Sequence, residues 1–294
     1  MNKNLSAFRL STLILGFIFL YGPILSLIVY SFNKSRLVTV WGGFSTQWYG
    51  RLFANQQILD AAWLSLKVAA INATGAVILG TLAGTALARF GKFKGRALLS
   101  SMTTAPLVMP EVITGLSLLL LFVAMEQVFG WPEGRGFTTI TIAHITLTLA
   151  YVTVIVQSRL ATLDDSLEEA AMDLGARPGK VFFVITLPII APALISGWLL
   201  SFTISIDDVI MSAFLCGPDT TTLPLVLLSR MRIGLDPEIN ALGTLLITAV
   251  GVIVAGNGWF VMKREQRRTR ELRVTLAGGP PPAPAVAVRP VPDT

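Results

Sequence analysis

Three carboxylates interrupt long apolar stretches of this chain: Glu111 lies in one stretch, and Asp207 and Asp208 lie side by side in another. A charged side chain at the centre of a membrane span costs about 2.5–3.5 kcal/mol, so it normally faces a cavity or a partner. Because carboxylates complement cations, these three residues are candidates for lining a pathway for a positively charged substrate. Adjacent helical residues point about 100° apart. The two aspartates therefore need not share a role, and the alternative is that one of them caps a helix or pairs within an assembly.

Other polar and aromatic side chains lie in the apolar stretches. Trp198 and Phe202 precede the aspartates and offer aromatic faces to a cation, although packing or lipid contact is the simpler interpretation. We expect His144 to be a hydrogen-bonded residue within a span, and Lys67 to reach the membrane surface or to pair with another group. With one histidine and one cysteine, Cys216, in the chain, we expect no metal site, no histidine-based catalytic centre and no disulfide framework.

The elements that carry these side chains are predicted to be membrane-spanning helices. The chain is 53% hydrophobic and only 14% charged, with a mean hydropathy of +0.69, whereas soluble domains are about 25% charged. Gly80 and Gly84 lie on a small-residue face that favours close helix packing, and Pro106 and Pro110 predict a kink. We expect an all-α membrane protein with six transmembrane helices. The six predicted spans are residues 10–32, 61–88, 97–123, 138–159, 189–215 and 241–262.

The basic residues predict how the chain is oriented. Six spans place both termini on one side of the membrane, and that side carries 16 of the 23 lysines and arginines, against six on the other. The positive-inside rule puts both termini in the cytoplasm, so the net charge of +6 reflects topology and does not indicate nucleic-acid binding. On the outer side we expect residues 33–60 to form a polar loop with aromatic side chains at the membrane interface. These aromatics are Trp41, Trp48 and Tyr49. Arg230 and Arg232 are candidates for contacting an extracytoplasmic partner.

Residues 163–188, between the fourth and fifth spans, form the longest charged and helical passage of the chain. Ser166 and Glu169 fit a capping box at the start of a short helix. Gly175 suits the left-handed residue that ends such a helix, and Pro178 suits the first turn of a second one. The first helix has one apolar stripe, formed by Leu167, Ala170, Ala171 and Leu174. We expect two short cytoplasmic helices whose stripe docks on a partner, the alternative being a helix folded back on the membrane surface.

One pattern within this passage is specific: Glu-Ala-Ala, three residues, Gly, nine residues, Ile-x-Leu-Pro. Its fixed positions are Glu169, Ala170, Ala171, Gly175, Ile185, Leu187 and Pro188. With this pattern the chain resembles the permease subunits of ABC importers. The resemblance covers nearly the whole membrane part and is greatest to the polyamine-importer permeases, in particular the putrescine-type second permease subunit. The segments that carry it are WGGFSTQWYG, APLVMPEVITGLSLLLLF, SFTISIDDVIMSAFLCGP, TTLPL and DPEINALGTLL.

The resemblance implies a type I ABC importer permease fold with a cytoplasmic coupling helix. It implies that the residues that couple to the ATPase are Glu169, Ala170, Ala171, Leu174 and Gly175. The chain itself would be non-catalytic and hold no cofactor, with ATP and magnesium bound on a partner. Consistently, the nearest likeness to a phosphate-binding loop, residues 175–181, is one residue too short and lacks the Ser or Thr that would ligate magnesium.

The resemblance also implies partners and a location. The partners would be a second homologous permease subunit, two cytoplasmic ATPase subunits and a periplasmic polyamine-binding protein. The complex would import putrescine or spermidine across the bacterial inner membrane. The predicted organisation is a cytoplasmic N-terminus (1–9), a permease domain (10–262), and a basic, then Pro-rich cytoplasmic tail (263–294). The alternative function is an ion-coupled secondary transporter of an organic cation, which would not need the two short helices.

Overall fold

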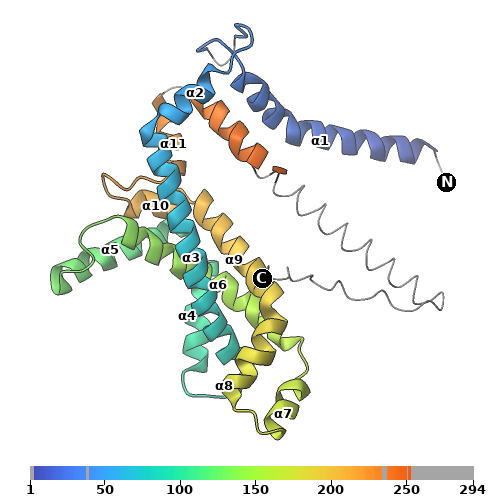
Figure 1. Cartoon of the computed structure of the whole chain (residues 1–294), viewed down its shortest axis with the longest axis vertical. Coiled ribbons are helices and arrows are strands. Elements are labelled where there is room, and N and C mark those ends of the chain that lie inside the picture. Colours follow the sequence, from blue (N-terminus) through green and yellow to red (C-terminus); the bar gives the residue numbers. More distant parts are fainter. Residues whose placement is uncertain (1–2, 38–39, 234–236, 250, 253–294) are drawn as a thin grey trace, which may run out of the picture. The chain divides into compact units, whose positions relative to one another are not determined.

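The computed structural model describes residues 3–37, 40–233, 237–249 and 251–252, and these residues are almost entirely helical (Figure 1). They belong to two compact units, Met1–Gly50 with Pro237–Thr294, and Arg51–Asp236, which are described separately. Within the described part, five helices are long and apolar enough to cross a membrane, which confirms an all-α, multi-pass protein. These helices are Arg9–Ser31, Gln56–Arg89, Glu111–Phe129, Phe137–Ala161 and Pro178–Asp207. Of the predicted span 241–262, residues 241–249 and 251–252 are helical and the others lie outside the described residues.

The first unit contains α1 (Lys3–Ser31) and the start of α2 (Gln47–Ala54). The prediction that residues 33–60 form a polar loop is wrong in part, whereas the placement of its aromatics at the membrane interface stays a prediction. Residues 47–54 are helical, and Trp48 is only 2% exposed. Its indole Nε1 donates a hydrogen bond to the Asn33 carbonyl at 2.5 Å. The sequence pattern does not show this acceptor, 15 residues away.

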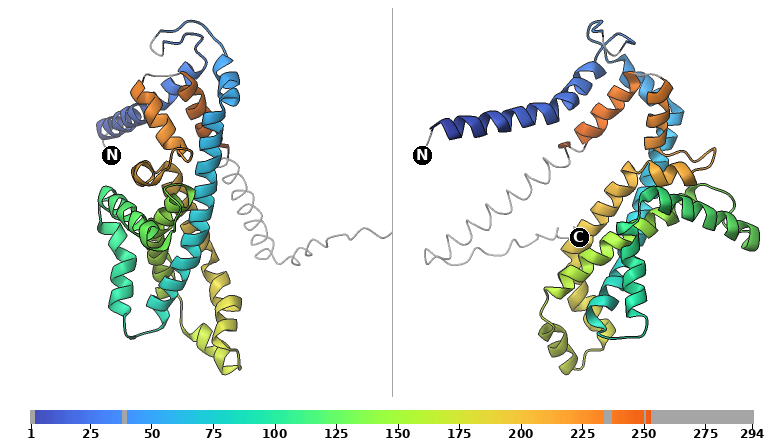
Figure 2. Two further views of the ribbon diagram at one scale, coloured as in Figure 1. Left: turned by 90° about the vertical axis from the view of Figure 1, so that its left-hand side faces the viewer. Right: turned by 180° about the vertical axis from the view of Figure 1, so that it is seen from behind.

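The second unit is built on α3 (Gln56–Arg89), α6 (Phe137–Ala161) and α9 (Leu187–Asp207), which pack together along much of their lengths (Figures 1 and 2). A Cβ at Gly80 would lie 2.7 Å from the Cβ of Val152, and one at Gly84 would lie 2.9 Å from the Cβ of Val156. The small-residue face predicted on the second span therefore lets α3 approach α6 closely. Beside this contact lies an apolar core cluster of Ala76, Val152, Val156, Leu160 and Ile190.

The third predicted span, 97–123, is wrong as a single helix. The chain forms α4 (Arg96–Val108), breaks at Met109 and Pro110, and resumes as α5 (Glu111–Phe129) in a different direction (Figures 1 and 2). Met109 is extended, with φ −77° and ψ 137°. A residue before proline is driven out of the helical region, and proline supplies no amide donor. The predicted kink is thus a complete break, and α5 alone is long enough to cross a membrane.

The fifth predicted span, 189–215, is also interrupted. It is preceded without a break by α8 (Pro178–Val181) and a π-helical turn, η1 (Phe182–Thr186), and α9 then ends at Asp207. Asp208 is extended, with ψ 128°, and the chain turns into the short helix α10 (Ile210–Leu215) and later α11 (Leu223–Ile233). The break separates the two aspartates that the sequence places side by side.

Candidate functional site

The passage between α6 and α9 folds as two short helices, as predicted. The first is α7 (Ser166–Asp173), and α8 follows after Gly175. Gly175 has φ +83°, its amide donates to the Met172 carbonyl at 2.8 Å, and the next amide, of Ala176, donates to Ala171 at 3.1 Å. These bonds satisfy carbonyls at the end of the helix, and the left-handed conformation suits glycine. Pro178 occupies the first turn of α8.

The predicted capping box is wrong. The Ser166–Glu169 capping box does not form; instead the Asp164 carboxylate accepts a hydrogen bond from the backbone amide of Ser166 at 3.0 Å. This donation from Ser166 lowers the pKa of the exposed Asp164 carboxyl. Since Glu169 is not used as a cap, its exposed side chain is available for an external contact.

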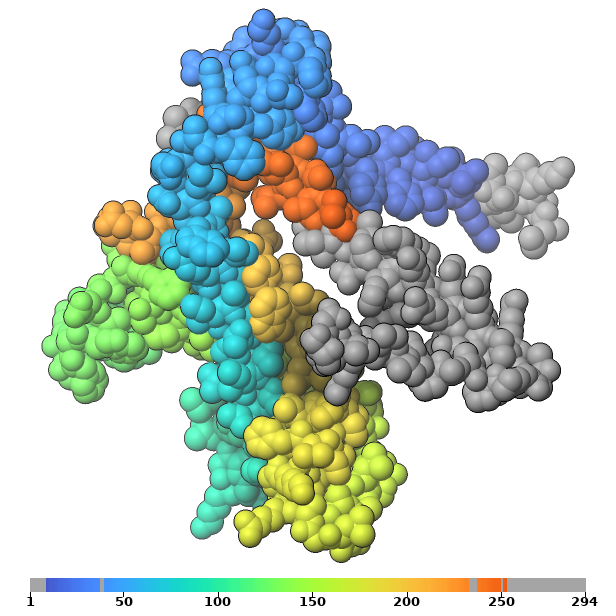
Figure 3. Space-filling model, in the orientation of Figure 1, coloured from blue at the N-terminus to red at the C-terminus, as the bar shows by residue number. Residues whose placement is uncertain are grey.

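The stripe on α7 is exposed. The side chains of Leu167 and Leu174 are 52% and 91% exposed, and none of the residues of α7 is buried. In the space-filling view, the segment that carries α7 and α8 forms the lower end of the second unit, and its surface faces outward (Figure 3). The five predicted coupling residues, Glu169, Ala170, Ala171, Leu174 and Gly175, lie together on this segment.

A polar cluster ties α7 to the membrane helices. Arg89, in the last turn of α3, pairs through Nη1 with Asp165 and through Nε with the Glu168 carboxylate, at 3.3 Å for the latter. The other oxygen of Glu168 accepts a hydrogen bond from the Thr186 hydroxyl at 2.7 Å. Sequence reasoning did not single out Arg89, Glu168 or Thr186, because they lie far apart in the chain.

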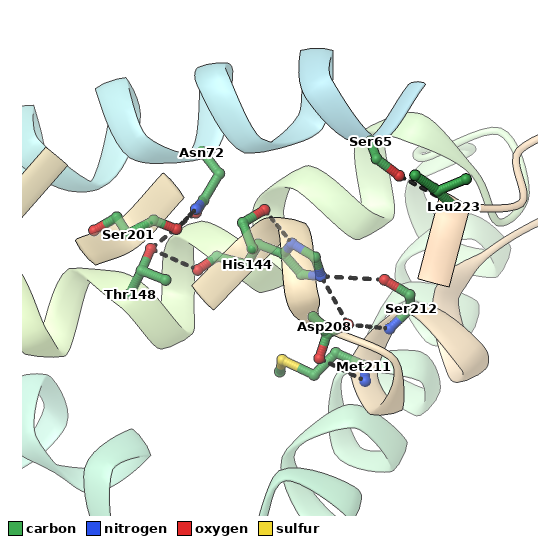
Figure 4. Close-up of polar contacts among 10 residues, drawn as sticks. Ser65, Asn72, His144, Thr148, Ser201, Asp208, Met211, Ser212 and Leu223 are labelled. Atoms are coloured by element: carbon green, nitrogen blue, oxygen red, sulfur yellow. Dashed lines mark hydrogen bonds and ion pairs between the residues drawn. The ribbon is translucent and has the colours of Figure 1, made fainter. Parts of the chain in front are cut away.

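Asp208 lies in a buried polar cluster (Figure 4). Its carboxylate is 3.1 Å from His144 Nε2 and accepts hydrogen bonds from the backbone amides of Met211 at 3.3 Å and Ser212 at 2.8 Å. His144, on α6, is 2% exposed, and its Nδ1 is 2.7 Å from the Ser205 hydroxyl. Asp208 thus caps α10 and joins it to α6, and His144 is the hydrogen-bonded residue that the sequence predicts.

The other two acids occupy different settings. Asp207 is exposed at the last residue of α9, and Glu111 is exposed at the first residue of α5. Within the described residues, no hydrogen bond or ion pair joins either of them to Asp208. Of the three predicted pathway acids, the Asp208 side chain is buried and hydrogen-bonded, whereas Asp207 and Glu111 are exposed.

A second buried contact crosses α3, α6 and α9 beside the His144 cluster (Figure 4). The Asn72 amide donates to the Ser201 carbonyl at 3.0 Å, and its oxygen accepts from the Thr148 hydroxyl at 2.8 Å. All three residues are fully buried. Sequence reasoning missed this contact; the only available signal was an asparagine within an apolar run.

The aromatic candidates have partners within the second unit. Trp198 stacks on Phe202 with ring centroids 5.2 Å apart, and its indole lies 3.2 Å from the Thr74 hydroxyl. The ammonium group of Lys67 lies 5.3 Å from the centroid of the Trp63 ring. This cation–π contact agrees with the expectation that Lys67 pairs within the protein.

Comparison with known proteins places the chain. Residues 76–260 match the family described as the inner membrane component of binding-protein-dependent transport systems. The chain is 56% identical over 274 residues to the putrescine transport system permease protein PotI of Escherichia coli K12, an alignment that covers 93% of this chain and 97% of the relative. It is 38% identical over 255 residues to the spermidine/putrescine transport system permease protein PotC of the same strain, with coverage of 87% and 94%.

A solved structure supports the fold. A chain of a bacterial ABC transporter that imports the acidic polysaccharide alginate superimposes with a TM-score of 0.62 at 14% sequence identity, covering 90% of this chain and 98% of that one. At this identity the likeness concerns the fold alone, and it agrees with the type I permease fold that the sequence predicts. The family match covers more than half of the chain, and the two permeases align over nearly its whole length. The chain therefore belongs to the family of inner membrane components of binding-protein-dependent transport systems.

Proposed function

We propose that this chain is a permease subunit of an ATP-driven importer that carries polyamines, with putrescine as the preferred substrate, from the periplasm to the cytoplasm. The observation that carries the proposal is the 56% identity to a putrescine permease over 93% of the chain. The similarity to a spermidine/putrescine permease at 38% identity supports the same substrate class.

We assign ATP binding, half of the pathway and substrate delivery to three kinds of partner subunit. ATP and magnesium bind on two cytoplasmic ATPase subunits, since no residues of this chain form a phosphate-binding loop. A second, homologous permease subunit supplies the other half of the pathway, and a periplasmic polyamine-binding protein delivers the substrate. The chain is inserted in the inner membrane with both termini in the cytoplasm, as the positive-inside rule predicts.

The exposed face of α7 is the docking surface for an ATPase subunit. An apolar stripe with leucines 52% and 91% exposed gains stability when a partner removes it from water. Glu169, exposed and not used as a cap, lies beside the stripe and is available to a basic group of the partner. Movement of the docked ATPase then reaches the membrane helices through α7.

The exposed acids are the residues best placed for substrate. A diamine carries positive charges at neutral pH, which an accessible carboxylate can contact at little cost. Asp207 and Glu111 meet this requirement because both are exposed. Asp208 is instead assigned the capping and pairing role, since its oxygens already bond to His144 and the start of α10.

Reconstitution tests this function. The complete complex of both permeases and the ATPases is placed in proteoliposomes with ATP inside, the polyamine-binding protein outside, and radiolabelled putrescine as the probe. We expect uptake that requires internal ATP and the binding protein and that persists when an ionophore collapses ion gradients. Uptake that is abolished by the ionophore and is independent of ATP would instead identify an ion-coupled transporter.

A further inference from the structure

We propose that Arg89, Glu168 and Thr186 form a transmission node that makes α7 move together with α3 and α9 during the transport cycle. The inference rests on the proposed function, in which an ATPase subunit displaces α7. It assigns a positioning role to three residues outside the five predicted coupling positions. It also assigns different roles to two adjacent glutamates: Glu169 contacts the ATPase subunit, and Glu168 contacts the membrane helices.

Apolar packing of α7 against the rest of the unit is limited. None of its residues is buried, and a cavity of about 660 Å³ lies between the end of α3 and the segment from α7 to η1. The cavity is lined by Leu82 of α3, Phe90 directly after α3 and Met172 of α7, together with Arg89, Glu168 and Thr186. Since a helix without buried apolar residues is free to shift relative to its neighbours, its polar contacts decide which helices follow it.

One carboxylate makes these contacts in two directions. Glu168 Oε2 lies 3.3 Å from Arg89 Nε on α3, and Oε1 accepts a hydrogen bond from Thr186 Oγ1 at 2.7 Å. Thr186 is the last residue of η1, which continues directly into α9. Glu168 therefore joins α7 to the ends of two membrane helices.

Burial makes this link stronger than an ordinary surface ion pair. The side chains of Arg89 and Glu168 are 16% and 21% exposed, whereas that of Asp165, the second partner of Arg89, is 67% exposed. Partly buried charges are screened less by water and salt, and a hydrogen bond to a charged group is about twice as strong as a neutral one. Glu168 therefore makes the more buried of the two ion pairs of Arg89 and is the only one of the two acids that also bonds to Thr186 within the described residues.

The node lies at one end of a direct path to a candidate substrate residue. From Thr186, α9 continues for 21 residues to Asp207 at its other end, a length of roughly 30 Å at ~1.5 Å per residue. Along that length α9 packs against α3 and α6. A displacement of α7 that is held at the node thus reaches the aspartate through a continuous helix.

The first test uses the complete complex in proteoliposomes, with ATPase activity stimulated by the binding protein loaded with putrescine. We expect Glu168→Gln and Arg89→Gln to reduce stimulation by about fivefold or more, in the range of typical coupling energies, while the ATPase subunits still co-purify. The exchange variant Arg89→Glu with Glu168→Arg should recover at least half of the stimulation. Lys180→Gln is the control, because Lys180 is an exposed charged residue of the neighbouring α8 that makes no ion pair within the described residues. Wild-type stimulation in both single variants, or loss of ATPase co-purification, would overturn the proposal.

The second test does not depend on the substrate. Spin labels at Asp173 on α7 and Leu79 on α3, in a Cys216→Ser background, report the distance between the helices without nucleotide and after trapping with ATP and vanadate. We expect one distance in both states with the native node, and two different distances in Glu168→Gln. A distance that changes with the native node, or stays fixed in Glu168→Gln, contradicts the proposal. Absence of stimulation by putrescine in the unaltered complex would count against the proposed substrate and leave this distance test decisive for the node.

Discussion

The stripe of α7 and the cluster around His144 differ in which kind of side chain is exposed to solvent and which is buried. On α7, leucines face outward and no residue is buried. In the His144 cluster, formed by His144, Ser205, Asp208 and Ser212, charged and polar groups are enclosed by membrane helices. The first arrangement is incomplete without a partner, and the second is complete within the subunit. The difference separates residues that serve an external contact from residues that hold the helices together.

The energetic consequences also differ. Removing one partner from a buried hydrogen-bonded pair can leave the other group unsatisfied and costs about 1–3 kcal/mol. Changing an exposed residue costs little stability, usually within about 0.5 kcal/mol. Substitutions in the two regions should therefore affect different measurements, and the predictions below use this contrast in order of decreasing effect.

The largest effect is expected from His144→Ala. The substitution removes one hydrogen-bonding partner each from the Asp208 carboxylate and the Ser205 hydroxyl, so the protein should lose about 1–3 kcal/mol of stability. Thermal inactivation of the solubilised complex measures this loss. Asp207→Ala, at the neighbouring but exposed acid, is the control and should leave the inactivation temperature nearly unchanged. Equal destabilisation by both substitutions would show that burial does not distinguish the two aspartates.

The next effect is expected on ATPase coupling through the α7 segment. Ala171→Asp places a charge on the docking stripe, and Gly175→Val forces a side chain into a left-handed conformation that costs about 1–2 kcal/mol, since Gly175 has φ +83°. Both variants should lose most of the ATPase stimulation by the binding protein and remain inserted in the membrane. Lys180→Gln, an exposed change on α8, is the control. Stimulation equal to that of the unaltered complex in both variants would contradict the assignment of α7 as the docking surface.

The same contrast explains what could be predicted from the sequence. The ends of α7 and α8 follow from local rules: Gly175 ends one helix and Pro178 starts the next, and the motif positions lie within 20 residues. The long spans follow from apolar runs of sufficient length. Every contact of the His144 cluster outside α10, in contrast, joins residues about 60 positions apart, and no local spacing encodes such pairs.

The errors have the same origin. The capping box on α7 is locally well formed, but Asp164 takes the first amide of the helix instead. A helix can break completely at Pro110 or Asp208 only if the backbone amide and carbonyl groups that lose their helical hydrogen bonds find other partners. At Asp208 they do, because its own carboxylate accepts the amides that start α10. Sequence reasoning identified each residue as unusual and could not tell a kink from a complete break.

A moderate effect is expected from Asp207→Asn. Losing an exposed carboxylate that contacts a cationic substrate should weaken apparent affinity for putrescine about five- to tenfold, equivalent to about 1–1.4 kcal/mol, with stability unchanged. Uptake at varied putrescine concentrations in the reconstituted complex measures it. Asp219→Asn, an exposed acid in the loop after α10, is the control. Unaltered uptake in Asp207→Asn would remove this residue from the pathway and leave Glu111 as the remaining exposed candidate.

The smallest effect is expected from Asp165→Asn, which tests the contrast within the α7 segment itself. Asp165 pairs with the same arginine as Glu168, but its side chain is 67% exposed, and exposed ion pairs contribute about 0–1 kcal/mol. Stimulated ATPase activity should therefore fall by about twofold or less, and the difference from the unaltered protein should shrink at high salt because exposed charges are screened. Glu168→Gln, measured in parallel, should lose more and depend less on salt. If Asp165→Asn has the larger effect, exposure is not what ranks the two carboxylates, and Arg89 acts mainly through the outer face of α7.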